Sequence, residues 1–135
     1  MARLRSRAGE GSVTGNLTEA ALGFGAKVPI FAGLVRSRPA LASRLGAAHG
    51  AGVTVLTAIE AGFAAYLEAE KRLGRIAADA DTQTLALAVI GTVHHLLSTG
   101  QAEQPDLHAQ VGRIITTLLA GVTATPSAPQ NAAPS

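Results

Sequence analysis

Two adjacent histidines, His94 and His95, are the first residues of this sequence whose chemistry needs an explanation. On a helix, neighbouring side chains point about 100° apart, so the two rings cannot bind one metal ion together. The other histidines, His49 and His108, are distant in the sequence, and no HxxxH or HExxH spacing occurs. Cysteine is absent, which excludes thiolate metal sites and cysteine nucleophiles. We therefore predict no metal site and no cofactor, and histidines that pack in a core or an interface.

Glu60 is a carboxylate on an apolar helical stripe, between Leu56 and Phe63. Such a group needs a hydrogen-bond partner, a cavity or a route to water. It is interpreted either as a glutamate at the edge of the stripe that reaches solvent, or as a polar anchor inside a ligand pocket. No paired carboxylate and no nucleophile–base set accompanies it, so the sequence does not predict an enzyme.

The aromatic residues gather on two predicted helices: Phe24 and Phe31 on the first, Phe63 and Tyr66 on the second. Core packing is the default explanation. If the two helices enclose a cavity, the same rings line it, because small-molecule pockets are mostly apolar with few polar groups. The hypothetical pocket consists of Phe24, Val28, Phe31, Leu56, Glu60 and Phe63.

The composition is unusually apolar for a chain of 135 residues, which is the length of one domain: 47% of residues are hydrophobic and 15% are charged. The richest apolar run, 85–93, is shorter than the ~20 residues that span a bilayer. Residues 8–16 are glycine-rich and polar where a secretory signal would be apolar. We therefore expect a cytoplasmic protein with no membrane partner, whose apolar excess covers a protein–protein interface.

The elements that position these residues are predicted to be helices throughout. Alanine is abundant, and proline is absent between Pro39 and Pro105. The predicted fold is an all-α bundle of about five helices, with Asp81 as an N-cap and Gly74 as a helix stop. The predicted helices cover 17–35 (kinked near Pro29), 40–45, 47–73, 82–99 and 106–122. Residues 1–16 are expected to be an irregular lead-in, 17–122 the domain, and 123–135 a disordered tail.

The last two predicted helices carry more apolar surface than one small core can cover. Residues 85–93 are apolar on every side of the helix, which is typical of a helix buried on all faces. We therefore expect one face to meet a second copy of the chain in a homodimer. The hypothetical interface consists of Val89, Ile90, Val93, Leu97, Val111, Ile114, Ile115 and Leu118.

Several stretches resemble the C-terminal regulatory domain of TetR-family transcriptional regulators. The most telling is YLEAEKRLGRI (66–76), followed by an Asp-capped apolar helix that contains LALAVIGTVHH (85–95). The resemblance extends over nearly the whole chain apart from its last dozen residues. It also rests on RLRSRAGEGSVTGNL (3–17), GFGAKVPIFAGLV (23–35), RPALASRL (38–45) and DLHAQVGRIITTLLAGV (106–122).

The resemblance implies an all-α domain whose last two helices form a four-helix bundle with a second subunit, and whose preceding helices enclose a small hydrophobic effector. Members of the family begin with a helix-turn-helix, which this sequence lacks, so we expect no operator binding by this chain alone. Arg3, Arg5 and Arg7 give at most weak, salt-sensitive contacts with phosphate. The alternative is a helical homodimeric structural or interaction protein without a ligand.

Overall fold

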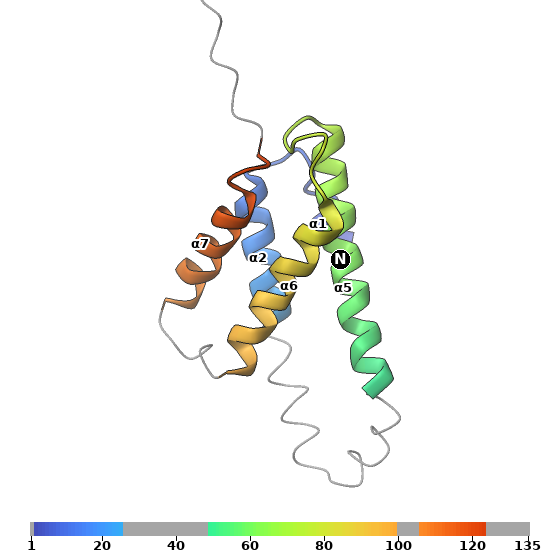
Figure 1. Ribbon diagram of the computed structural model, residues 1–135, viewed down its shortest axis with the longest axis vertical. Helices are drawn as coiled ribbons and strands as arrows, with labels where there is room; N and C mark the ends of the chain where they lie inside the picture. Colours follow the sequence, from blue (N-terminus) through green and yellow to red (C-terminus); the bar gives the residue numbers. More distant parts are fainter. Residues whose placement is uncertain (1, 26–48, 100–105, 124–135) are drawn as a thin grey trace, which may run out of the picture.

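The computed structural model describes residues 2–25, 49–99 and 106–123, without the side chains of 49–55 and 98. In this part of the chain every regular element is a helix, as predicted, and the only β-type pairing is an isolated bridge. Figure 1 shows the helices in sequence colours. They are α1 (Ala2–Arg5), α2 (Val13–Gly25), α5 (His49–Arg72), α6 (Thr82–Ser98) and α7 (Leu107–Leu119).

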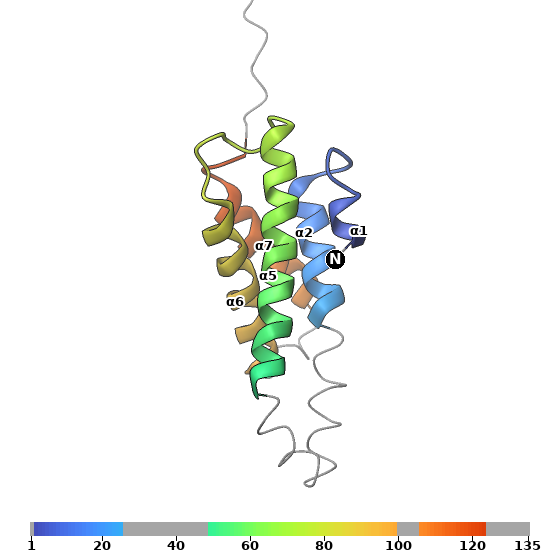
Figure 2. The same cartoon turned by 90° about the vertical axis from the view of Figure 1, so that its right-hand side faces the viewer.

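Four of these helices alternate in direction along one axis. In Figure 1, α2 and α6 run downward, and α5 and α7 run upward. Helix α6 packs against α5, α2 and α7, while α7 also packs against α2. The short α1 lies against α5, on the side of the bundle away from α6 (Figure 2). The described part is therefore an up-and-down bundle with one small helix added at its side.

The core lies where the inward stripes of these helices meet. On α7 the buried positions are Val111, Ile115 and Leu119, four residues apart, which is the spacing of one helix face. Helix α5 contributes Phe63, Tyr66 and Leu67, all without exposed surface. Burying each large apolar side chain stabilises the fold by about 1.5–3 kcal/mol.

The predicted signals at the ends of the helices are confirmed at two places. The Asp81 carboxylate accepts hydrogen bonds from the backbone N–H of Thr84 at 3.0 Å and from its hydroxyl at 2.6 Å, which caps α6. Gly74 follows the end of α5 with φ +74°, a left-handed conformation that glycine adopts without strain. Asp106 occupies the corresponding position before α7, but its side chain makes no capping hydrogen bond.

The beginning of the chain is more ordered than predicted. The irregular lead-in expected over 1–16 is wrong for 2–5, which form α1, and for 13–16, which belong to α2. Helix α2 begins early because the Ser12 hydroxyl accepts a hydrogen bond from the N–H of Gly15 at 3.0 Å. Leu4 on α1 is only 5% exposed, so this segment contributes to the core.

The loop between α5 and α6 is tied to the end of α7. The N–H of Ala77 donates a hydrogen bond to the carbonyl oxygen of Val122 at 2.7 Å, and Ile76 forms the isolated bridge with Thr123. Ile76 is buried beneath this pairing. Thr123, which was assigned to a disordered tail, is therefore held by the fold. The predicted kink at Pro29, the helix over 40–45 and the rest of the tail lie outside the described residues.

Over the same described ranges, none of the helices has the length and apolar character needed to cross a lipid bilayer.

Candidate functional site

The residues of the hypothetical pocket occupy two environments. Phe63 is fully buried in the core, whereas Phe24, Leu56 and Glu60 are partly buried. Because α2 and α5 are antiparallel, the end of α2 and the first half of α5 lie at the same end of the bundle (Figure 1). The two remaining residues, Val28 and Phe31, lie outside the described residues. The structure thus distinguishes Phe63, a core residue, from the partly buried Phe24, Leu56 and Glu60.

At that end of the bundle, α2 and α6 approach closely at Gly25. A β-carbon added at this buried glycine would lie 3.0 Å from a methyl carbon of Leu97. Any larger residue at position 25 would therefore require the Leu97 side chain to move. Leu97, which is predicted to contact a second copy, is partly buried against the core of its own chain.

A buried glutamate does lie on the apolar stripe of α5, but it is Glu70 and not Glu60. Glu70 has no exposed surface. Its two carboxylate oxygens each accept a hydrogen bond from the N–H of Gly9 at 3.3 Å, and one lies 3.3 Å from Nη1 of Arg75. Glu60 is only partly buried, which agrees with a glutamate at the edge of the stripe.

Asn16 and Tyr66 extend this polar cluster into the core. The amide nitrogen of Asn16 donates hydrogen bonds to the Tyr66 hydroxyl oxygen at 2.9 Å and to the carbonyl oxygen of Glu10 at 2.8 Å. Burial raises the pKa of Tyr66 above its usual range, and the hydrogen bond to the Glu70 carboxylate raises it further. The neutral hydroxyl is therefore the form that the folded chain favours.

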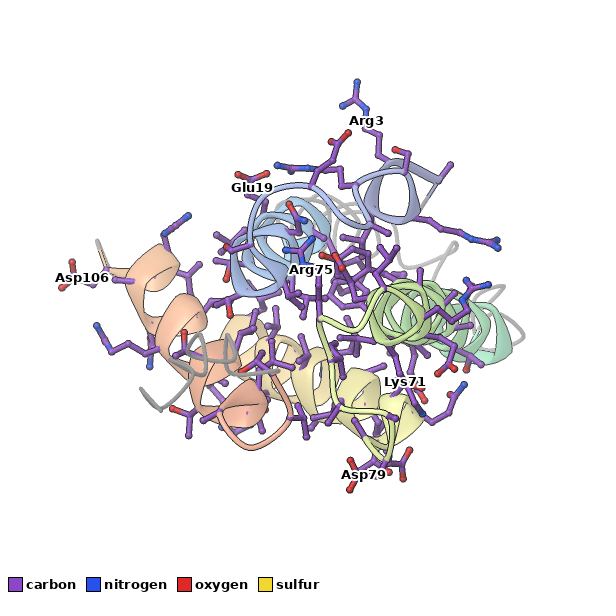
Figure 3. All side chains as sticks on the ribbon, turned by 90° about the horizontal axis from the view of Figure 1, so that it is seen from above. Arg3, Glu19, Lys71, Arg75, Asp79 and Asp106 are labelled. Atoms are coloured by element: carbon purple, nitrogen blue, oxygen red, sulfur yellow. The ribbon has the colours of Figure 1, made fainter. Side chains whose placement is uncertain are left out.

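Arg75 closes the cluster from the loop after α5. Its guanidinium pairs with Glu70 and also donates a hydrogen bond to the carbonyl oxygen of Gly11. Figure 3, a view from above, shows Arg75 over the middle of the bundle, whereas Arg3, Asp79 and Asp106 project from its edges. We call Asn16, Tyr66, Glu70 and Arg75 the polar junction.

The chemistry of the polar junction is structural in this arrangement. Within the described residues, every buried side-chain nitrogen and oxygen has a hydrogen-bond partner. The Glu70 carboxylate has no exposed surface, accepts hydrogen bonds from the N–H of Gly9 and pairs with Arg75. The junction therefore links the segment before α2 to α5 and to the loop that follows α5.

The polar junction was not predicted from the sequence, although one signal for it was present. Glu70 follows Phe63, Tyr66 and Leu67 at spacings of seven, four and three, which continues the buried stripe by one turn. Glu60 satisfies the same kind of spacing. The two glutamates differ in their hydrogen-bond partners. Glu70 is bound by Gly9, which lies 61 residues earlier in the sequence, and local spacing does not reveal such a distant partner.

The hypothetical dimer interface is largely the core of a single chain. Five of its residues are buried within one chain: Val89, Ile90, Val93, Val111 and Ile115. Their contact with a second copy stays a prediction. Val89, Ile90 and Val93 lie on α6, which packs against α5, α2 and α7. Val111 and Ile115 lie on α7, which packs against α2 and α6. Ile114 and Leu118 are partly buried against the same core.

The outward face of α6 carries different residues. Leu87 is 56% exposed, and Gly91, four residues later on the same side of the helix, is also exposed. Nothing in the described structure would contact a β-carbon added at Gly91. His94 and His95 are exposed on the next turn. In the part of the chain that the structure covers, no group of three or more His, Asp or Glu residues could hold a metal ion.

No protein-family model matches this chain, and searches of curated proteins and of solved structures find no significant match.

Proposed function

We propose that this chain is the effector-binding and dimerisation domain of a TetR-type transcriptional regulator. The order and spacing of α5, α6 and α7 support the proposal, because they follow the stretches that resemble that family. The observation that carries it is the outward face of α6, where Leu87 is exposed beside the bare Gly91. A second copy covers this apolar leucine and uses the missing side chain for close approach of the two helices.

In this proposal the dimer is a four-helix arrangement of α6 and α7 with their counterparts. The contacting residues are those of the outward face, Leu87 and Gly91 with His94 on the next turn, and not the inward residues predicted from the sequence. An obligate interface of this kind buries about 2,000 Å² or more in total.

The proposed effector is a small hydrophobic molecule. Phe24 near the end of α2, Leu56 in the first half of α5 and Glu60 at its middle remain partly exposed, and together they combine apolar surface with one carboxylate. A ligand there changes the spacing of two subunits only by binding one spacing more tightly than the other. Operator recognition is not proposed for the described helices.

The dimer is tested by light scattering at micromolar concentration, where we expect a dimer. Leu87→Gln should shift the chain toward monomer without lowering its helix content. The control is Leu73→Gln, because Leu73 is 57% exposed but lies beyond the end of α5. A monomeric wild-type chain, or equal effects of the two variants, would contradict the proposed interface.

The alternative function is a helical homodimeric scaffold without a ligand, and the complete burial of Phe63 favours it. Thermal melts with a panel of lipophilic compounds distinguish the two, because a specific ligand stabilises the folded chain by mass action. A compound that raises the melting temperature of the wild-type chain but not of Glu60→Gln supports the effector site. No shift across the panel supports the scaffold.

A further inference from the structure

The segment before α2, residues 2–11, is held by the rest of the molecule mainly through its own main chain. Asn16 donates to the carbonyl oxygens of Arg7 at 3.4 Å and Glu10 at 2.8 Å. Glu70 accepts from the N–H of Gly9, and Arg75 donates to the carbonyl oxygen of Gly11. Four backbone groups of the segment are thus bound by side chains of the polar junction.

The side chains of this segment contribute one buried residue to the core. Leu4 is its only member of the buried apolar cluster, with Ala8 packed partly against it. The ion pair between Arg7 and Glu19 is exposed, and exposed pairs stabilise folds weakly. Helix α1 has four residues, which is too short to be stable alone.

Two glycines give the segment its shape. Gly9 and Gly11 have φ values of +85° and +55°, a region that other residues rarely adopt. Their backbone groups are the ones that Glu70 and Arg75 bind. The polar junction therefore recognises one particular main-chain conformation of the segment.

We propose that residues 2–11 form a strap that opens and closes as one unit on an intact four-helix bundle, and that Asn16, Glu70 and Arg75 are the catch that holds it closed. When the strap opens, its backbone groups replace their hydrogen bonds to Asn16, Glu70 and Arg75 by hydrogen bonds to water. Opening also exposes the Glu70 carboxylate to solvent. The buried residues of α6 and α7 keep their main neighbours, because α6 packs chiefly against α5, α2 and α7, and α7 chiefly against α2 and α6, whereas α1 packs chiefly against α5 and α2. The strap does not depend on the proposed regulatory function.

Hydrogen exchange of the full chain, read by mass spectrometry, tests this proposal. The Glu70→Gln substitution keeps the size of the side chain but removes its negative charge. The charged carboxylate accepts the hydrogen bond from the N–H of Gly9 and pairs with the Arg75 guanidinium. We expect peptides covering 2–12 to exchange roughly tenfold faster or more, since hydrogen bonds to charged groups are the stronger ones. Peptides of α6 and α7 should exchange at the wild-type rate.

The matched control is Glu68→Gln, two residues away on α5, whose carboxylate is about half exposed and bonds Thr82 instead. This variant should leave exchange over 2–12 unchanged. Equal acceleration of the strap and of α6 and α7 in Glu70→Gln would overturn the proposal, because the strap would then open only with the whole fold. If exchange over 2–12 were unchanged in Glu70→Gln, Glu70 would not be part of the catch and the proposal would be overturned.

Arg75→Lys provides a second test if Glu70→Gln does not fold. Lysine keeps the positive charge but not the planar fork that reaches both Glu70 and Gly11. Faster exchange confined to 2–12 supports the catch. Wild-type exchange, or acceleration throughout the bundle, contradicts it.

Discussion

At the Gly74 end of the bundle, the buried Glu70 is surrounded by polar partners, whereas along α7 every buried side chain is apolar. The two regions are buried to a similar depth but are stabilised differently. Apolar packing at Ile115 is not directional and tolerates exchange among side chains of similar volume. The polar junction depends on direction, because a buried polar group that loses its partner destabilises the fold more than the pair stabilised it.

The largest expected effect comes from charges placed in the apolar region. Ile115→Asp with Leu119→Asp puts two unpaired carboxylates at positions with almost no exposed surface. We expect loss of the fold, because each buried charge costs several kcal/mol. Circular dichroism and denaturant titration measure this. The control is Thr116→Asp with Thr117→Asp on the exposed side of α7, which should stay folded. A folded monomer in the first variant would place these residues at an interface.

A smaller loss is expected when the polar junction loses one donor. Asn16→Ala removes the hydrogen bonds to Tyr66 and to two backbone carbonyl oxygens. The free energy of unfolding should fall by about 2 kcal/mol, because acceptors are left buried without a donor. Urea titration checks this, with Gln83→Ala on the exposed face of α6 as the control. An unchanged urea midpoint would mean that water replaces Asn16 at no cost.

The Tyr66 hydroxyl should make stability depend on alkaline pH. Its pKa is raised in the folded chain, so its contribution is complete below the unfolded value near 10 and is lost as pH rises through the folded value. Tyr66→Phe should cost about 1 kcal/mol at neutral pH and reduce the decline above pH ~10. Urea midpoints of both chains at neutral and alkaline pH measure this. Parallel declines would assign the effect to other groups.

The smallest expected effect concerns the two aspartates that precede α6 and α7. Asp81→Ala should lower the melting temperature more than Asp106→Ala, because only Asp81 accepts hydrogen bonds from the next turn. The hydroxyl of Thr84, followed by its N–H, lowers the pKa of Asp81 below its usual range. The stability that Asp81 contributes is therefore present above pH ~4 and lost as pH falls below it. Equal shifts in the two variants would contradict this distinction.

The boundaries of α5, α6 and α7 follow from the sequence to within a few residues, because periodicity and the Asp81 and Gly74 signals are local. The orientation of α6 does not. Residues 85–93 are apolar on all sides, so the sequence alone does not say whether Leu87 or Val89 faces the core. The packing of α6 against three helices decides this, and it places Val89 inside and Leu87 outside.

The polar junction could not be predicted from the sequence for a related reason. Glu60 and Glu70 both fit the apolar stripe, and both precede further helical residues. Only the fold brings Gly9, Asn16 and Arg75 to one of them. The glycines at 9 and 11 indicated an irregular segment, but their positive φ values serve a defined conformation instead.

The chain has one tyrosine and no tryptophan, and that tyrosine lies in the polar junction. Its near-ultraviolet signal therefore comes mainly from a single ring, with only weak bands from three phenylalanines beside it. A near-ultraviolet spectrum of the unmodified protein therefore reports on the surroundings of Tyr66, beside the backbone of residues 7–11. No attached dye is needed.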